Sequence, residues 1–155
     1  GIMQHEGNQY SVSGIRYRDY YRKASLELNI APAYPAKAKV NSWIRTVTLN
    51  RKSKVTIAEK YDLQEYISPL TEHFITPLQP DTTLAGRVKL TDSAGNSAYY
   101  LRYDPSRFRA GYESIPINDQ RMYGVWGDHL YRVTLYAKKQ RTKDSFSIVV
   151  EKAAP

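Results

Sequence analysis

Three histidines are the side chains best suited to acid–base chemistry in this chain, and they lie far apart in the sequence: His5, His73 and His129. None belongs to a short metal-ligand spacing such as H-x-x-x-H, so we predict no metal site. The segment "DLQEYISPLTEH" places three carboxylates before His73, but no motif fixes a pair of them for proton transfer. We therefore expect surface roles for the histidines and assign no catalytic residue.

Other forms of catalysis and cofactor binding also lack a sequence signal. No serine lies in a nucleophile elbow, and no glycine-rich run has the spacing of a phosphate-binding loop. The chain contains no cysteine, which excludes disulfides, thiol catalysis and Cys-based metal sites. We predict no cofactor.

A cluster of positive charge is the clearest candidate for binding. In "VNSWIRTVTLNRKSKVTIAEKYDL", residues 40–63, two alternating runs flank a turn and predict a β-hairpin. Its tip presents Arg51, Lys52 and Lys54, with Arg45 behind them. Arg can bind sulfate or carboxylate groups bidentately and Lys acts as a point charge, so these four residues form a candidate anion site. Lys and Arg at a turn also keep a sheet soluble and its edges unpaired, which is the simpler interpretation and the one we favour.

The charge is uneven along the 155 residues, whose formal net charge is +8. Residues 1–60 carry 11 Lys and Arg against 4 acidic residues, whereas residues 61–155 carry 12 against 11. A basic half suggests a polyanionic partner. In "GIRYRDYYRK", residues 14–23, basic and aromatic residues interleave as in proteins that bind single-stranded nucleic acid. A two-sided strand produces the same interleaving, and no recognised binding motif accompanies it, so we predict no nucleic-acid partner.

Period-two alternation dominates the chain and predicts the elements that position these residues. Half-buried strands are expected at residues 23–30, 42–50, 54–63, 86–92, 97–104, 130–139 and 145–152. In residues 54–63 the alternation places Glu59 and Tyr61 on the same face as Val55 and Ile57. No segment has sustained helical spacing, and short turns near "PAYPAKA" and "NDQRMYG" are the only helical candidates.

This pattern of many short strands separated by turns predicts an all-β fold, an antiparallel β-sandwich. We expect residues 1–152 to form one sandwich domain, followed by a tail at residues 153–155. No apolar run approaches the length of a membrane span, roughly 20 residues. "GIMQHEGNQY" lacks the apolar core of a secretory signal.

An ordered set of short motifs is similar to the C-terminal region of heparinase II/III-like polysaccharide lyases. The strongest of them are Tyr34-Pro35, Ser42-Trp43-Ile44-Arg45 and Leu49-Asn50-Arg51. The likeness continues through "HFITP", "LRYDPSRF", Glu113 and "WGDHLYRVTL", and "GIMQ" resembles the turn that opens the same region. These motifs span nearly the whole chain and are structural rather than catalytic.

The resemblance implies a fold and a function. Such lyases pair an N-terminal helical toroid with a C-terminal antiparallel β-sandwich, and they cleave uronic-acid-containing glycans by β-elimination. No catalytic residue or metal ligand of the family can be carried onto this chain. The chain is thus expected to be a non-catalytic part of a longer lyase, periplasmic or extracellular, that supports the toroid of its own parent chain and contacts an acidic polysaccharide. In this setting Arg45, Arg51, Lys52 and Lys54 become candidate glycan-binding residues.

Two alternatives remain open at this stage. The chain could be a stand-alone module that binds a polyanion, either a glycan or nucleic acid. It could also be an enzyme in its own right, with His73 or His129 and a tyrosine as the acid–base pair.

Overall fold

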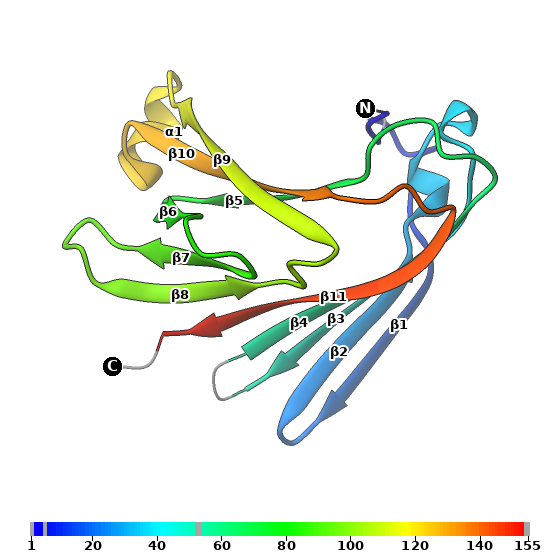
Figure 1. Cartoon of the computed structure of the whole chain (residues 1–155), viewed down its shortest axis with the longest axis horizontal. Coiled ribbons are helices and arrows are strands. Elements are labelled where there is room, and N and C mark those ends of the chain that lie inside the picture. Colours follow the sequence, from blue (N-terminus) through cyan, green and yellow to red (C-terminus); the bar gives the residue numbers. More distant parts are fainter. Residues whose placement is uncertain (1, 5, 52–53, 154–155) are drawn as a thin grey trace. The chain divides into compact units, whose positions relative to one another are not determined.

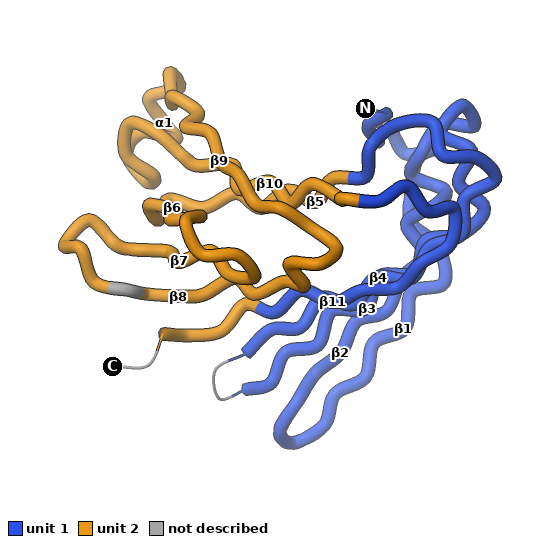
Figure 2. The backbone as a smooth tube through the Cα atoms, viewed as in Figure 1, with its two compact units in different colours: residues 1–70, 139–149 blue, residues 71–138, 150–155 orange. Residues whose placement is uncertain are grey.

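The computed structural model describes residues 2–4, 6–51 and 54–153, and strands dominate it (Figure 1). One sheet has eight strands in the order β1-β2-β3-β4-β11-β8-β7-β6, and the other has three strands in the order β5-β10-β9. The predicted all-β antiparallel sandwich is confirmed. The chain divides into two compact units, residues 1–70 with 139–149 and residues 71–138 with 150–155 (Figure 2).

Unit 1 is an antiparallel meander joined by the first part of the last strand (Figure 1). Two short 3-10 turns lie between its second and third strands. Its elements are β1 (Ser13–Tyr20), β2 (Lys23–Asn29), η1 (Ala31–Ala33), η2 (Ala36–Ala38), β3 (Val40–Asn50), β4 (Lys54–Leu63) and the unit 1 part of β11 (Lys143–Lys152). All eight residues of β1 are exposed, as suits an edge strand that carries charged side chains.

The core of unit 1 is a row of aromatic rings on one face of its sheet. Tyr34 stacks on Trp43 with 5.9 Å between ring centroids and 11° between the planes. Trp43 also contacts Tyr61 at 5.3 Å, and Tyr61 meets Phe146 edge-on at 6.5 Å. Each such pair adds about 1 kcal/mol beyond the burial of its area. Trp43, Tyr61 and Phe146 come from three neighbouring strands, so this row holds β3, β4 and β11 together.

Unit 2 contains the remaining strands and one short helix. Its elements are β5 (Thr71–Thr76), β6 (Gln79–Asp81), β7 (Arg87–Thr91), β8 (Ser97–Arg102), β9 (Phe108–Pro116), α1 (Gln120–Trp126) and β10 (His129–Ala137), with the end of β11. The side chains of Val88, Leu101, Val133 and Leu135 are almost fully buried and form its core. The Asp119 carboxylate accepts a hydrogen bond from the Arg121 amide at 2.8 Å and caps α1.

The strands that alternation predicts are all present, and the two segments expected to turn helically contain η1, η2 and α1. The hairpin of residues 40–63 is β3 and β4, paired from Asn50↔Lys54 to Val40↔Leu63. The strands predicted from alternation did not include β1, β5, β6 or β9. In β9 the interruption is Gly111, which pairs with Thr134 of β10. A Cβ at Gly111 would lie 3.4 Å from the Tyr136 ring, an ordinary van der Waals contact.

Ala153, expected in the tail, is buried, and its amide donates to the Ala98 carbonyl at 3.1 Å. Residues 154–155 lie outside the described part. No helix among the described residues is long and apolar enough to cross a membrane.

Candidate functional site

The register of unit 1 gives its sheet two chemically different faces. Directly paired residues of neighbouring strands point to the same face. Trp43 pairs with Tyr61, and Arg45 pairs with Glu59, so these four side chains share the aromatic face.

The opposite face is polar and is called here the cationic face. One row across it is Arg16, Glu27, Thr46 and Ala58; a second is Arg18, Ser25, Thr48 and Thr56; a third is Tyr20, Lys23, Asn50 and Lys54. Lys60 and Asp62 of β4 continue the alternation, as do Lys143, Ser145 and Ser147 of β11. Among the described unit 1 residues of these strands, the face carries six Lys and Arg against two acidic residues, Glu27 and Asp62.

The predicted binding residue Arg45 lies on the aromatic face. Its Nε donates to Oε1 of Glu59, whose other oxygen accepts from the Trp43 indole N–H at 2.7 Å. The Glu59 side chain is fully buried, whereas that of Arg45 keeps 31% of its surface exposed. Burial raises the pKa of Glu59, opposed by the nearby Arg45 charge and by the hydrogen bonds from Arg45 and Trp43. Arg45 therefore neutralises a buried carboxylate, and only its partly exposed end is left for an anion.

The other three predicted residues lie near the β3–β4 turn. Arg51 forms an exposed ion pair with Asp19 of β1. Lys52 lies outside the described residues. Lys54 is exposed at the start of β4 and belongs to the cationic face. The structure thus separates the four residues: Arg45 and Lys54 point to opposite faces of one sheet.

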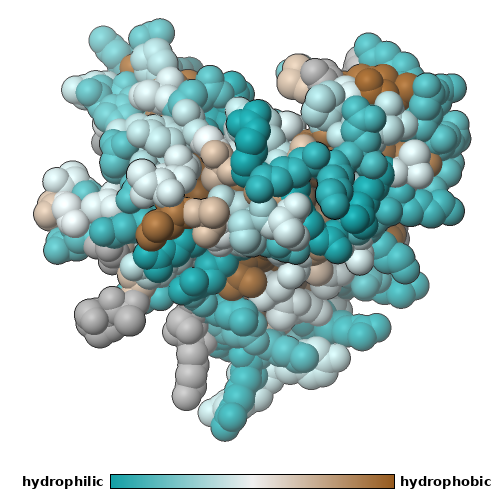
Figure 3. All heavy atoms as spheres, viewed as in Figure 1, coloured by the Kyte–Doolittle hydropathy of each residue, from teal (hydrophilic) through white to brown (hydrophobic). Residues whose placement is uncertain are grey.

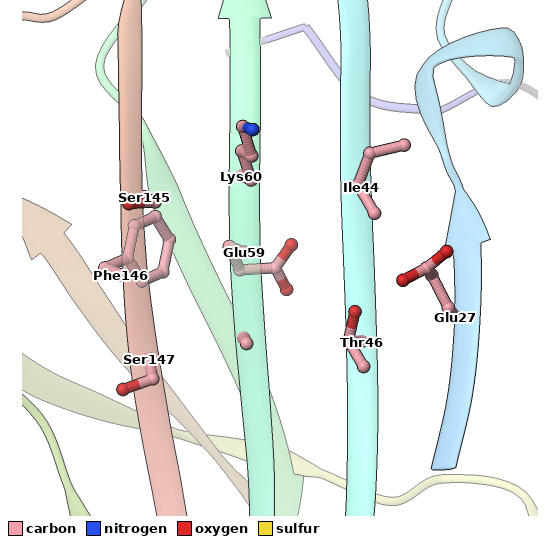
Figure 4. Close-up of a pocket in the computed structure, with 9 residues that line it drawn as sticks. Glu27, Ile44, Thr46, Glu59, Lys60, Ser145, Phe146 and Ser147 are labelled. Atoms are coloured by element: carbon pink, nitrogen blue, oxygen red, sulfur yellow. The ribbon is translucent and has the colours of Figure 1, made fainter.

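A shallow groove crosses the cationic face. It has a volume of about 520 Å³ and is lined from β2, β3, β4 and β11. Figure 4 shows Ile44 and Thr46 of β3 between Glu27 of β2 and Glu59 of β4, with Ser145 and Ser147 on β11. A smaller groove of about 130 Å³ adjoins it and is lined by Arg16, Arg18, Ser25, Glu27 and Thr46. Both grooves are lined by Glu27 and Thr46, so they are neighbours, and together they are called here the depression.

The histidines fall into different surroundings. His5 lies outside the described residues. In unit 2, His73 lies between two threonines, with Nε2 3.1 Å from the Thr71 hydroxyl and Nδ1 3.0 Å from that of Thr134. Loss of solvation and the nearby Arg132 charge lower the pKa of His73, while Glu113 acts in the opposite direction. This environment favours the neutral imidazole.

His129 lies in a chain of hydrogen-bonding groups in unit 2. Its Nδ1 is 2.5 Å from the Asp128 carboxylate, and its Nε2 is 2.7 Å from the Tyr131 hydroxyl. That hydroxyl also bonds to Gln79, whose amide nitrogen is 3.5 Å from the Tyr112 hydroxyl. The Asp128 carboxylate holds Nδ1 of the imidazole and thereby points Nε2 at the Tyr131 hydroxyl. In this geometry a proton can pass between His129 and Tyr131. Sequence reasoning named His129 but not Tyr131, although residues two apart in a strand share a face.

No group of three or more metal-binding side chains occurs within the described residues. Two sets of described residues have groups placed for binding or proton transfer: the cationic face in unit 1 and the Asp128–His129–Tyr131 cluster in unit 2.

Comparisons with known proteins add a fold relationship. A scan against protein-family models and a search of curated proteins both found no match. Two solved structures of heparan sulfate lyase HepC from Pedobacter heparinus, one of them a mutant, match with TM-scores of 0.65 and 0.66 and sequence identities of 15% and 16%. The match covers 91% of this chain and 21% of the lyase. The chain shares its fold with a part of that lyase. The resemblance inferred from the sequence motifs is thereby confirmed at the level of the fold, and the chain spans about a fifth of the length of the lyase it matches.

Proposed function

We propose that residues 1–152 form a non-catalytic C-terminal β-sandwich of a heparinase II/III-like polysaccharide lyase. The parent protein would cleave acidic, uronic-acid-containing glycans by β-elimination. The observation that carries this proposal is the similarity to a heparan sulfate lyase over 91% of the chain at 21% of that lyase's length. A chain of this extent corresponds to one part of a larger lyase and pairs with a helical toroid from the same parent chain.

The sandwich also contacts the anionic glycan, through Arg51, Lys52, Lys54 and the exposed end of Arg45. Support comes from the concentration of positive charge in residues 1–60 and from the exposure of Arg51 and Lys54. The role is to add positive potential that draws the glycan toward the lyase. We propose that the parent protein acts in the periplasm or outside the cell, as the resemblance to this lyase family implies.

The test of the non-catalytic role is an assay for the unsaturated product of β-elimination. The purified chain is incubated with heparan sulfate and with other uronic-acid glycans, and ultraviolet absorbance is followed against a heat-denatured sample. We expect no product from this chain. Product that depends on the folded chain would refute the non-catalytic role.

A second candidate function rests on one observation, the contact between His129 and Tyr131. With Asp128 holding the imidazole, the pair could act as the base and acid of an activity that belongs to this chain. If the assay above gives product, His129→Gln and Tyr131→Phe should each abolish it. His73→Gln is the matched control, because His73 contacts threonine hydroxyls instead of a tyrosine and should leave product formation unchanged.

A further inference from the structure

Several Lys and Arg side chains of the cationic face are not used in ion pairs with other described residues and can bind an external anion. Within the described part of the chain, no hydrogen bond or ion pair joins the side chains of Arg18, Lys54 or Lys60 to another residue. Arg16 pairs with Glu27 only at 3.5 Å, and both side chains are exposed. An exposed ion pair of this kind contributes little to stability, so an incoming anion can compete for Arg16 at small cost.

The shape of this face suits a chain laid across the strands. Small side chains occupy its middle, including Ser25, Thr46, Ala58, Ser145 and Ser147, and the two grooves of the depression follow them from β1 to β11. Arg16 and Arg18 lie at one end of the depression and Lys60 lies toward the other. In the view of Figure 3, hydrophilic residues cover most of the visible surface and hydrophobic ones form small separate groups.

We propose that the cationic face of unit 1 binds an extended acidic polysaccharide, with its carboxylate or sulfate groups on Arg16, Arg18, Lys54 and Lys60 and its hydroxyls on the Ser and Thr side chains between them. Arg supplies directional pairs of N–H donors for these anionic groups, and Lys supplies point charges. The site shares Lys54 with the β3–β4 turn and extends the proposed glycan contact onto the sheet, so it rests on that proposed function.

The composition of the face favours a glycan over a nucleic acid. Proteins that bind single strands without sequence preference stack successive bases on aromatic side chains. Among the paired rows of the cationic face, Tyr20 is the one aromatic residue, and Lys23 already lies 5.4 Å from its ring centroid. The hydroxyl-rich centre instead matches the many hydroxyls of a sugar polymer.

The experiment compares three double variants of the whole chain, each of which removes two positive charges. The face variant is Arg18→Gln with Lys60→Gln, the turn variant is Arg51→Gln with Lys52→Gln, and the control is Lys139→Gln with Lys152→Gln. Lys139 and Lys152 are exposed and lie off the cationic face. Binding of a heparin oligosaccharide is measured by calorimetry at fixed salt, and circular dichroism verifies that each variant is folded.

We expect the face variant to weaken heparin binding about tenfold relative to the control, as two modest charge contacts would. The charge-preserving variant Arg18→Lys with Lys60→Arg should recover most of this affinity, which keeps the test decisive if the glutamine variant is unstable. A hyaluronan oligosaccharide, which has carboxylates but no sulfates, distinguishes the two kinds of anionic group.

Equal heparin affinity of the face and control variants would overturn the inference. Weaker binding in the turn variant alone would also overturn it, but would leave the proposed glycan contact at the turn intact. Failure of the unmodified chain to bind heparin or hyaluronan would overturn both. Tighter binding of single-stranded DNA than of either glycan, weakened in the face variant, would assign the face to a nucleic acid and also overturn the inference.

Discussion

The indole N–H of Trp43 donates to the Glu59 carboxylate at 2.7 Å inside unit 1. Trp43 lies on β3 and Glu59 on β4, so the bond joins neighbouring strands through side chains in addition to the backbone ladder. The same carboxylate accepts from Arg45, and no solvent-exposed surface remains on it. Glu59 is thus the centre of a buried polar contact beside the aromatic row.

Replacing Glu59 by Ala should lower the free energy of unfolding by about 3 kcal/mol. The change removes the acceptor of the buried Trp43 N–H and leaves a space in the core. Urea denaturation followed by tryptophan fluorescence measures the effect. The matched control is Glu65→Ala, an exposed site that should change the free energy by no more than about 0.5 kcal/mol. Equal effects at the two positions would contradict the role assigned to Glu59.

The raised pKa of Glu59 predicts a specific pH dependence. Because the folded state holds the Glu59 proton more tightly than the unfolded state, the stability from this group is fully present below the unfolded pKa. It is lost as pH rises through the folded pKa. Gln cannot ionise, so the stability of wild type relative to Glu59→Gln should fall as pH rises above the ordinary carboxyl range. Urea denaturation across this range measures it, and a difference independent of pH would be inconsistent with the raised pKa.

Two adjacent residues of β11 should respond very differently to truncation. The Ile148 side chain is fully buried, whereas Ser147 is exposed on the opposite face of the strand. Ile148→Ala should cost about 3 kcal/mol through lost burial and a residual cavity. Ser147→Ala should stay within about 0.5 kcal/mol. Chemical denaturation of both variants checks this alternation, and a large effect at Ser147 would show that the two faces are assigned the wrong way round.

Two glycines form a second matched pair. Gly86 has φ +86°, and a Cβ there would lie 3.3 Å from the Pro105 ring, so Gly86→Ala should destabilise the fold by about 1–2 kcal/mol. A Cβ at Gly124 in α1 would meet nothing within 4 Å, so Gly124→Ala should stabilise the helix by up to about 1 kcal/mol. For a chain of this size each kcal/mol shifts Tm by about 2–4 °C. Thermal melts should therefore move in opposite directions, and shifts of the same sign would contradict one of the two assignments.

Alternation along the chain was sufficient to predict most strands, because the side-chain period of a strand is a local property. It also predicted that Glu59 shares a face with Val55, Ile57 and Tyr61. It failed in β9, where Gly111, a residue type depleted in strands, interrupts the pattern. The candidate site was predicted from residues that are close in sequence: Arg45, Arg51, Lys52 and Lys54. Closeness in sequence does not decide which face of a sheet a charged side chain occupies, and Arg45 and Lys54 lie on opposite faces.

The sequence by itself determined that this protein is built from antiparallel strands, that residues 40–63 form a hairpin, and that positive charge gathers in residues 1–60. Tertiary structure alone decided which charges are available. Strand register paired Arg45 with Glu59 on the aromatic face, and it aligned Arg16 and Arg18 of β1 with Lys54 and Lys60 of β4 on the other. It also brought Gln79 to the Tyr131 hydroxyl beside His129. These contacts join residues far apart in the chain, so they depend on packing free energy and not on local propensity.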